Sequence, residues 1–548
     1  MSERARTRRW ASRIYADLRA GGPTLYLALL AASLLLVIIY LRVNRFLNPQ
    51  LAVPGFPIDD GYIYSNYVRY ASEGHFFQYN PGEQSGGVTS LLWYLLLLPA
   101  RLLLRLFSSD ILTLAVGSAY LLGTLLLALT AWLSYRLTQE VISPLLPATG
   151  RLLPVITMLA VLLNPQVIWA ALSGLELPLS LAMVLLACYL FLRDLRDLRY
   201  EGDWPGVLAI GLLPWARPEL LVLTAVFLGV VFAAALLGRW PWRGAMRLLA
   251  GSAGLTGLLL TIYYLGYGRP LPSSFYAKVR PFSPGKLGQA TVQLWQDGHW
   301  LTVLLFAGIA ITGVVIAVAG WQRFRRSPTP NRQAKVEQPH TLALFSTLIV
   351  AYYLALSFSL SWFGQENRYL LPMLPLVTIV LIGRTALSLA LTDWRVNTPG
   401  WLTAAVLAGL VLVGGWYARE WAGSRYAVEA GNIYTAHIQP ARWLQAHTPA
   451  DAVVAVEPAG ALGLLSDRRL VDVVGLTTSP QLGRYKDWPA TWPYLRAQRV
   501  TYLLYYPRWL QQEIGDLPPW LRPVQQYDLA NNLIAGDSRI TLYAVEGQ

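Results

Sequence analysis

Long apolar runs recur along this chain of 548 residues and restrict it to folds that a lipid bilayer accepts. A run of ~20 apolar residues crosses the hydrocarbon core as a helix. Backbone polar groups in lipid must bond within their own segment, so repeated runs predict a helical bundle. We place about 11 spans, at residues 24–43, 111–135, 151–170, 176–192, 205–216, 219–237, 248–266, 300–320, 341–361, 369–391 and 400–417. The predicted fold class is therefore an α-helical polytopic membrane protein.

The apolar segment 88–107 decides the topology. Three later loops are rich in arginine: 193–199, 238–247 and 321–327. If 88–107 crosses the membrane, these loops lie outside, whereas an interfacial helix places them inside with the arginine-rich N-terminus. Cytoplasmic loops are enriched in Lys and Arg, so we interpret 88–107 as interfacial, with the N-terminus inside and the C-terminus outside. Arg101 and Arg105 then lie outside, with their stems on the lipid boundary and their heads in water.

Three regions follow from this topology. Residues 1–23 are predicted to be a basic cytoplasmic tail, and 24–419 a membrane domain whose first external loop is 44–110. Residues 420–548 contain no span. Segments rich in β-branched and aromatic residues predict strands at 453–458, 469–475, 500–506 and 540–546, with helices at 441–447 and 489–498 between them. Strands that alternate with helices indicate a small α/β domain, expected outside the membrane over the first loop.

Charge and cysteine content exclude several classes of function. The net charge of +14 is explained by arginine beside the spans. We find no basic stripe with interleaved aromatic residues, so nucleic acid is not an expected partner. Cys188 is the only cysteine, which excludes intrachain disulfides and cysteine-based metal sites.

An acidic pair, Asp59 and Asp60, lies in the first external loop. Such a pair in a loop often forms only a turn or a helix N-cap. A carboxylate at this depth can also take the proton from an acceptor hydroxyl, as glycosyl transfer requires. The predicted topology brings further polar groups to the same outer face: Glu176, Arg217, Lys278 and Arg368.

Each of these further groups has a structural and a chemical interpretation. Cations at the boundary commonly anchor a helix by snorkelling, but they also hold phosphate, which arginine binds bidentately. Glu176 precedes a span, where the helix dipole favours an acid. His75 lies in an aromatic-rich stretch and is either a loop residue or a sugar contact. Charges near the bilayer midplane, which a proton-coupled transporter needs, are almost absent.

The first loop resembles that of the C-type (GT-C) glycosyltransferases. The run DDGYIYSNYVRYASEGHFFQYNPGEQSGGVTSLLW, residues 59–93, is similar to proteins related to bacterial terminal arabinofuranosyltransferase. Further segments match in order: 164–176, 215–221, 271–279, 367–376 and 443–476. The resemblance covers about residues 55–480. One departure is QSGGVT at 84–89, where relatives carry an aromatic residue.

The resemblance implies inverting transfer of a sugar from a polyprenyl-phosphate donor to an acceptor hydroxyl at the outer face of a bacterial-type plasma membrane. Relatives mostly use the first acid of the pair as base, which favours Asp59 over Asp60. Three cations are candidates for the donor phosphate: Arg217, Lys278 and Arg368. Four residues are candidates for sugar or acceptor contacts: Tyr62, His75, Asn80 and Glu176. The resemblance fixes no cofactor with certainty. A divalent metal is compatible with the pattern but not required.

The resemblance leaves the substrates open. The sugar is unassigned, with arabinofuranose and mannose as candidates, and the acceptor is a glycan, a lipid or a protein; membrane lipids surround the bundle. Two other functions also remain. A transporter or flippase of a lipid-linked sugar would show inverted repeats or midplane charges. A non-catalytic assembly protein that binds polyprenyl lipid would point its acidic pair away from any cavity.

Overall fold

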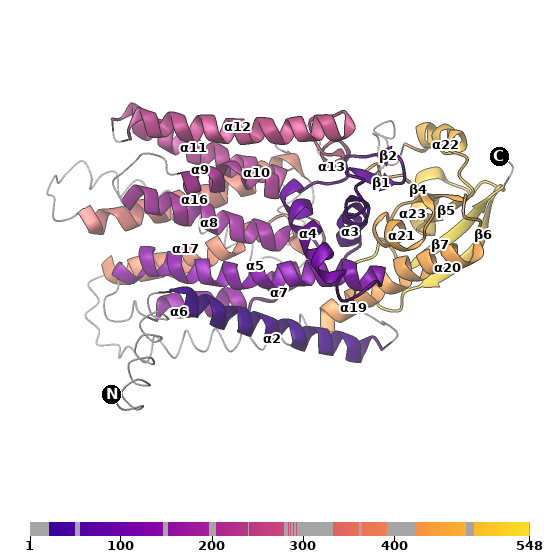
Figure 1. The fold of residues 1–548 in the computed structure, drawn as a ribbon, viewed down its shortest axis with the longest axis horizontal. Coiled ribbons are helices and arrows are strands. Elements are labelled where there is room, and N and C mark those ends of the chain that lie inside the picture. Colours follow the sequence, from indigo (N-terminus) through magenta and orange to yellow (C-terminus); the bar gives the residue numbers. More distant parts are fainter. Residues whose placement is uncertain are drawn as a thin grey trace.

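The computed structural model describes most of the chain. The described residues are 21–49, 55–145, 152–196, 204–238, 240–278, 333–360, 364–391, 424–477 and 487–546, with isolated positions between 283 and 292. They form a helical bundle with an α/β domain at one end (Figure 1).

Six helices of the described residues are long and apolar enough to cross a membrane, or seven if one bent pair counts as a span. The six are α2 (Pro23–Leu47), α5 (Ile111–Val141), α8 (Leu177–Arg196), α11 (Leu221–Leu236, which spans the membrane together with the preceding turn from Pro218), α12 (Trp242–Tyr267) and α16 (Gln333–Ser359). The bent pair is α6 (Leu153–Leu162) and α7 (Pro165–Leu172), which meet at 51° beside Pro165. The prediction of a polytopic helical membrane protein is confirmed.

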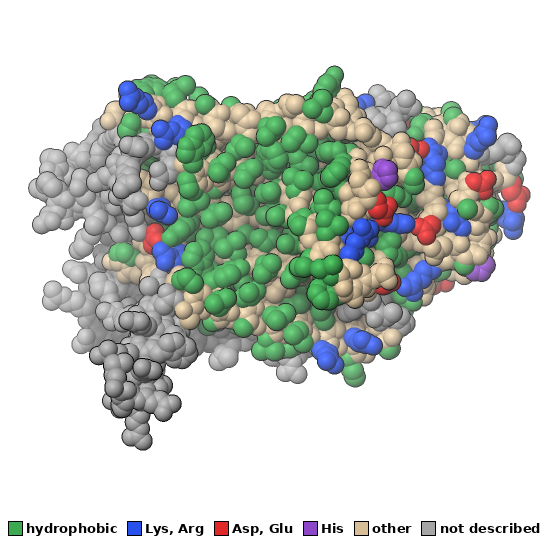
Figure 2. Space-filling model, in the orientation of Figure 1, with side chains coloured by type: hydrophobic (Ala, Val, Ile, Leu, Met, Phe, Trp, Pro, Cys, Tyr) green, Lys and Arg blue, Asp and Glu red, His purple; other side chains and the backbone are tan. Residues whose placement is uncertain are grey.

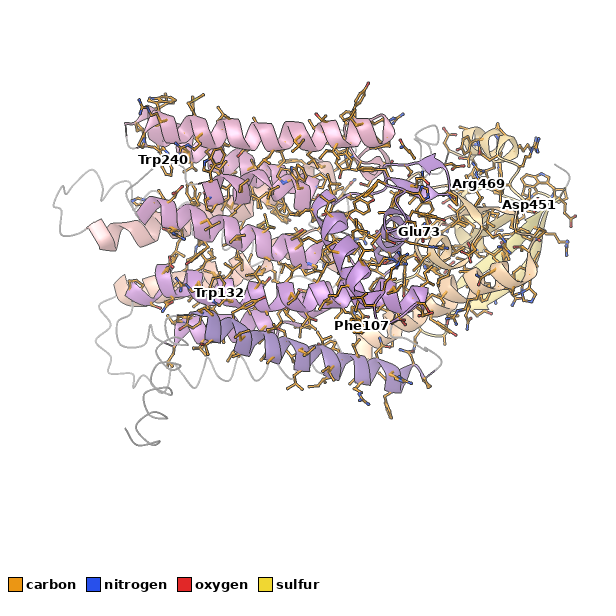
Figure 3. All side chains as sticks on the ribbon, viewed as in Figure 1. Glu73, Phe107, Trp132, Trp240, Asp451 and Arg469 are labelled. Carbon is orange, nitrogen blue, oxygen red and sulfur yellow. The ribbon has the colours of Figure 1, made fainter. Side chains whose placement is uncertain are left out.

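The bundle has a central pair of helices and a lipid-facing periphery. In α8 and α5, 78% and 61% of the most apolar window is buried, whereas α2 and α12 bury only 28% and 22%. Figure 1 shows α12 and α2 on opposite sides of the bundle with α5 and α8 between them. Figure 2 shows apolar side chains over the middle of the bundle, with charged side chains towards its two ends. Trp132 and Trp240 lie towards the end away from the domain (Figure 3).

Several predicted spans differ from the structure or fall outside it. The segment 205–216 is divided into α9 (Trp204–Gly211) and α10 (Leu213–Ala216), which together are short for a straight crossing. The segment 369–391 becomes a 3-10 turn, η5 (Leu371–Met373), followed by α17 (Leu374–Leu391). The predicted spans 300–320 and 400–417 lie outside the described residues.

The segment 88–107 forms α4 (Leu91–Leu104), whose 14 residues are too few for a straight crossing. Arg105 is exposed and reaches Glu73 at 3.5 Å, near the junction of bundle and domain (Figure 3). Arg101 is only 3% exposed, so the expectation that its head reaches water is wrong. It shares the buried face of α4 with Leu97, one turn earlier, and that face packs on the bundle.

The first loop forms compact structure between the bundle and the domain. Its main element is the almost fully buried α3 (Asp60–Ala71), followed by the short strands β1 (Gln78–Asn80) and β2 (Glu83–Gln84). Further short elements lie between the long helices: η1 (Ser143–Leu145), η2 (Pro218–Leu220), α13 (Ser273–Lys278) and η4 (Gln365–Asn367).

The C-terminal domain contains a five-stranded mixed sheet in the order β4-β3-β5-β7-β6. Its strands are β3 (Val453–Val456), β4 (Arg469–Asp472), β5 (Tyr502–Tyr505), β6 (Leu521–Asp528) and β7 (Arg539–Val545). Its helical elements are α19 (Ser424–Ile433), the π-helical turn η7 (Tyr434–Ile438), α20 (Gln439–His447), α21 (Gly460–Leu465), α22 (Trp488–Ala497) and α23 (Pro507–Ile514).

The predicted α/β class of this domain is confirmed, including four strands and two helices. Sequence analysis missed β6, an edge strand that pairs antiparallel with β7. It lacks a clear alternation of apolar residues, and it contains Pro523, which an edge strand tolerates because one side of its ladder has no partner strand.

Strands β4, β3 and β5 run parallel, so their carboxyl ends lie at the same edge of the sheet. The chain leaves β3 for β4 on one side and later returns to β5 on the other. In open α/β sheets, such a switch point opens a crevice at the carboxyl ends of the strands. Here that edge faces the end of the bundle that carries α3.

Candidate active site

Two cavities lie where the bundle meets the C-terminal domain. The bundle cavity, of about 270 Å³, is lined mainly by ends of membrane helices and includes Glu176, Arg217 and Glu219. The domain cavity, of about 380 Å³, is lined by both parts of the molecule. Residues that follow β3, β4 and β5 contribute to it, so the sheet presents its carboxyl edge to this space: Glu457, Pro458, Ala459, Val474, Leu476, Tyr506 and Trp509.

The two cavities share one wall. Seven residues line both: Asp60, Ile63, Ser359, Leu360, Arg368, Tyr369 and Leu476. Only Asp60 and Arg368 among them carry charge. A group bound in either cavity would therefore meet the same carboxylate and the same guanidinium.

Asp60 and Arg368 form an ion pair in this wall. Nη2 of Arg368 lies 3.0 Å from Oδ2 of Asp60, with side-chain exposures of 9% and 31%. Asp60 is the first residue of α3, where the helix dipole favours a negative charge. Nη1 of Arg368 is buried and has no hydrogen-bond partner within the described part of the chain. A buried donor without a partner is costly, and an acceptor atom bound beside Nη1 would remove that cost.

An unusual backbone holds Arg368 in place. Gly364, Glu366 and Asn367, just before it, all have positive φ angles, of 77°, 56° and 51°. Non-glycine residues adopt this conformation only where surrounding contacts fix it. Glu366 is fixed by an ion pair with Arg425 of α19. The C-terminal domain therefore supports the loop that aims Arg368.

Arg425 also pairs with Glu429, one turn further along α19, at 3.1 Å. Glu429 is fully buried and accepts a hydrogen bond from Nε1 of Trp169 at 2.7 Å. Burial, followed by repulsion from Glu366, raises the pKa of Glu429 to about 8. This carboxyl therefore belongs to a buried acidic pair bridged by one arginine.

Arg217 lies between two carboxylates in the bundle cavity. Its guanidinium is 3.0 Å from Oε1 of Glu176 and 2.6 Å from Oε1 of Glu219, with only 4% of its side chain exposed. It also lies 5.0 Å from the ring centre of Tyr369. Arg217 thus neutralises buried acids, whereas Arg368, which lines both cavities, retains a buried donor without a hydrogen-bond partner in the described part of the chain.

Asp59, the neighbour of Asp60, is held by the C-terminal domain. Its Oδ2 accepts a hydrogen bond from Gly460 N at 2.6 Å, and its Oδ1 accepts one from Ala461 N at 2.9 Å. A Cβ at Gly460 would lie 2.7 Å from Cγ of Asp59 and closer still to its carbonyl oxygen, so only glycine fits. Asp59 lines the domain cavity but not the bundle cavity.

Sequence reasoning missed a group of residues from the domain. His437, Tyr506 and Trp509 line the domain cavity. The Tyr506 and Trp509 rings lie 5.0 Å apart, and both pack against Gly536, where a Cβ would come within 2.7 Å of each. Their signal in the sequence is weak, because single aromatic or histidine residues in an α/β domain commonly serve packing.

Three predicted contact residues lie away from both cavities. His75 is exposed in the turn after α3. Tyr62 is fully buried and accepts a hydrogen bond from Phe56 N at 2.9 Å. Asn80 fastens the first loop to β4 by exchanging two hydrogen bonds with the Leu470 backbone, at 2.9 and 3.0 Å. The side chain of Lys278, at the end of α13, lies outside the described residues.

The segment QSGGVT needs a glycine at position 86 for steric reasons. A Cβ at Gly86 would lie 2.6 Å from Cε1 of Tyr267 and closer to other atoms of that ring. Gly87 lines the bundle cavity. Tyr267, at the end of α12, thus supplies an aromatic ring beside this loop segment.

Comparison with solved structures identifies the fold. The Archaeoglobus fulgidus oligosaccharyltransferase in complex with Zn and sulfate gives a TM-score of 0.53 at 14% identity, over 93% of this chain and 72% of that one. The same enzyme tethered to an acceptor peptide with the NVT sequon gives 0.51 at 13% identity, over 88% and 69%. The chain has a GT-C-like fold.

Other comparisons add no activity to this GT-C-like fold. ArnT from Cupriavidus metallidurans bound to undecaprenyl phosphate gives a TM-score of 0.48 at 13% identity, over 95% of this chain and 98% of that one. A family described as a domain of unknown function, DUF8728, matches residues 429–543, which lie in the C-terminal domain. No curated protein matches by sequence.

Within the described ranges, no group of three or more His, Cys, Asp or Glu side chains could hold a metal ion. Cys188 is buried inside α8. The shared wall carries one carboxylate, of Asp60, and one guanidinium, of Arg368, beside the hydroxyl groups of Ser359 and Tyr369.

Proposed function

We propose that this protein is a GT-C glycosyltransferase that moves a sugar from a polyprenyl-phosphate donor to an acceptor hydroxyl with inversion. One observation carries the proposal: Asp60 and Arg368 stand together in the wall common to a helix-lined cavity and a domain-lined cavity. A lipid donor and an aqueous acceptor can meet only at such a boundary. The GT-C-like fold supports the same class of reaction.

The bundle cavity suits the donor. Apolar side chains of the membrane helices line it, among them Val222, Leu356 and Leu360, as a prenyl chain requires. Its polar end carries the unpartnered Nη1 of Arg368. Arginine binds phosphate bidentately, and we assign the donor phosphate to Arg368 first. Arg217 shapes this end of the cavity, since its own guanidinium is already held by Glu176 and Glu219.

The chemistry needs one proton acceptor and one stabilised leaving group. The acceptor oxygen attacks the anomeric carbon from the domain cavity and forms the new C–O bond. The bond from that carbon to the phosphate oxygen breaks, and the lipid phosphate leaves with the electron pair. The acceptor proton passes to the Asp60 carboxylate, and Arg368 stabilises the charge that grows on the phosphate.

We assign the base role to Asp60 rather than Asp59. Both oxygens of Asp59 are already occupied by hydrogen bonds from the backbone of α21. Asp60 borders both cavities and thus both reacting groups. Asp59 then serves to fix the start of α3, on which Asp60 stands.

A donor panel tests the proposal. Purified protein in lipid nanodiscs is incubated with undecaprenyl-phosphate sugars, including arabinofuranose and mannose, and short oligosaccharide acceptors. We expect release of undecaprenyl phosphate with at least one donor, and loss of undecaprenyl phosphate binding in Arg368→Met. Movement of an intact lipid-linked sugar across a vesicle, without release of undecaprenyl phosphate, would instead show a transporter. Binding without either activity would indicate an assembly protein.

We also propose that the site faces the outside of a bacterial-type plasma membrane. The support is the positive-inside bias of the arginine-rich loops. In a Cys188→Ser background, cysteine introduced at Ser108 should react with an impermeant maleimide applied to intact cells. Reaction only after permeabilisation would place this end of the bundle in the cytoplasm.

A further inference from the structure

His437 links the acidic pair to the aromatic side of the domain cavity. Its Nδ1 lies 3.0 Å from Oδ1 of Asp59, with 4% of the histidine side chain exposed. That contact has the length of an ion pair but not the alignment of a hydrogen bond. On the other side of the ring, Nε2 lies at hydrogen-bond distance, 3.1 Å, from Oη of Tyr506. Each ring nitrogen of His437 therefore lies close to one oxygen atom, Nδ1 to Oδ1 of Asp59 and Nε2 to Oη of Tyr506.

The backbone around His437 is unusual. The residue lies in η7, a π-helical turn of five residues between α19 and α20. Such turns are rare and occur frequently at functional sites, because the extra residue redirects the side chains of one turn. Here the redirected ring reaches the wall of the domain cavity instead of following the face of α20.

The partners of His437 are themselves fixed. Asp59 is held by the backbone N–H groups of Gly460 and Ala461, at the start of α21, the helix that follows β3. Tyr506 follows β5 directly and is 1% exposed. The ring of His437 therefore spans from the bundle-derived acid to the neighbouring strand end of the domain, across the switch point of the sheet.

We infer that His437 is a positioning residue, which holds Asp59 through Nδ1 and Tyr506 through Nε2 and so sets the acceptor side of the site. This inference rests on the proposed function. Asp59 immediately precedes Asp60, so a shift of Asp59 moves the base at the shared wall. A displacement of ~1 Å at a reacting group can cost about 10²-fold in rate. The C-terminal domain thereby supplies part of the catalytic geometry.

Two amide substitutions separate the two links. The amide nitrogen of His437→Asn takes a place close to Nδ1 and faces Asp59, whereas that of His437→Gln takes a place close to Nε2 and faces Tyr506. His437→Ala keeps neither. We expect kcat to fall about 10²-fold in His437→Ala, with recovery in His437→Asn larger than in His437→Gln. Tyr506→Phe removes the hydroxyl that Nε2 contacts. It should therefore lower kcat as much as His437→Asn does, because both variants lose the link to Tyr506, and it should raise the acceptor KM.

The measurements are kcat, acceptor KM and undecaprenyl phosphate binding, in nanodiscs, for the donor of the panel that wild type turns over. Lipid phosphate binding should stay unchanged, because His437 does not border the bundle cavity. His447→Ala is the matched control, since His447 lies exposed on α20 and stacks on Trp443 at 4.8 Å. Thermal unfolding corrects each rate for the folded fraction.

The outcomes separate this inference from the proposed function. Equal folded-fraction rates in the Ala, Asn and Gln variants of His437 would overturn the positioning role, because that role requires the nitrogens to differ. If Asp60→Asn is inactive in the same assay, the proposed function stands without the positioning role of His437. Wild-type rates in all His437 variants would also overturn the inference. A wild-type protein that turns over no donor would overturn both. If His437→Ala fails to fold, the rates of His437→Asn, His437→Gln and Tyr506→Phe decide. The inference requires His437→Asn to be faster than His437→Gln and Tyr506→Phe to match His437→Asn.

Discussion

The two cavities differ in how the chain brings functional groups to them. In the bundle cavity, charges stand at the ends of membrane helices and neutralise each other across hairpins, as Arg217 does with Glu176 and Glu219. In the domain cavity, the groups that follow the carboxyl ends of parallel strands include the carboxylate of Glu457 and the rings of Tyr506 and Trp509. The comparison shows two separate architectures, helix ends and strand ends, joined at one wall, and the proposed function assigns the lipid phosphate to the first and the acceptor hydroxyl to the second.

Asp59 and Asp60 divide along this boundary although they are adjacent in sequence. Asp59 is bonded to the domain, whereas Asp60 pairs with Arg368 of the bundle. The same side chain at consecutive positions therefore has different partners on the two sides of the wall, and the proposed function gives the chemical task to Asp60 alone.

The largest expected effect is on Asp60. Asp60→Asn keeps the shape of the side chain but cannot accept the acceptor proton, so kcat should fall by ~10²–10⁴. Undecaprenyl phosphate binding and the melting temperature should remain close to wild type. Asp110→Asn is the control, since Asp110 is an exposed N-cap that an amide can replace. Near-normal turnover in Asp60→Asn would move the base to Asp59.

The next largest effects are expected for substitutions of Arg217 and Arg368. The first should mainly lower stability, and the second should mainly weaken binding of the lipid phosphate. Arg217→Met leaves Glu176 and Glu219 without their shared cation, and removal of one partner from a buried ion pair costs ~3–5 kcal/mol. Arg368→Met should weaken lipid phosphate binding with a smaller loss of stability, because Asp60 is partly exposed. Thermal unfolding and binding of undecaprenyl phosphate measure the two effects. The reverse pattern would make Arg217 the phosphate ligand.

Asp59→Asn should lower stability as well as activity. The amide retains only one acceptor oxygen for the two backbone N–H groups, and a buried donor left unpaired costs ~1–3 kcal/mol. The free energy of unfolding and kcat should therefore fall together, unlike the pattern for Asp60→Asn. A loss of kcat at full stability would show instead that Asp59 acts chemically.

The close approach of α21 to Asp59 gives a smaller effect. Gly460→Ala places a methyl group against Asp59 and should cost ~1–3 kcal/mol by overpacking. Gly254→Ala, in α12, is the matched control, because no atom lies within 4 Å of its Cβ position. Alanine there should be neutral or stabilising by up to ~1 kcal/mol. Equal stability of the two variants would mean that α21 and α3 can separate freely.

The smallest expected effect concerns Glu429. Its pKa, raised to about 8 by burial and by Glu366, lies above the ~4.3 of an unfolded glutamate. The folded protein then binds more protons than the unfolded chain, so stability should fall as pH rises through this window. Glu429→Gln should flatten the slope of melting temperature against pH between about 5 and 8. An unchanged slope would show that another group titrates there.

Much of the architecture followed from local patterns in the sequence. Apolar runs identified the six long membrane helices, and β-branched segments identified four of the five strands around β3. The acidic pair, Glu176, Arg217 and Arg368 were chosen from their places beside predicted spans, and the structure gathers them at the two cavities. These signals are readable because span length and strand alternation are properties of consecutive residues.

The tertiary structure alone decided what each of these residues contacts. Asp59 bonds to Gly460, 401 positions away, and no local pattern encodes that pairing. His437 gained its place from a π-helical turn, while His75 and Asn80, equally polar in sequence, were turned to the surface and to β4. Hydrophobic periodicity determines which residues leave water, whereas the packing of α3 against the carboxyl edge of the sheet determines which polar groups then meet.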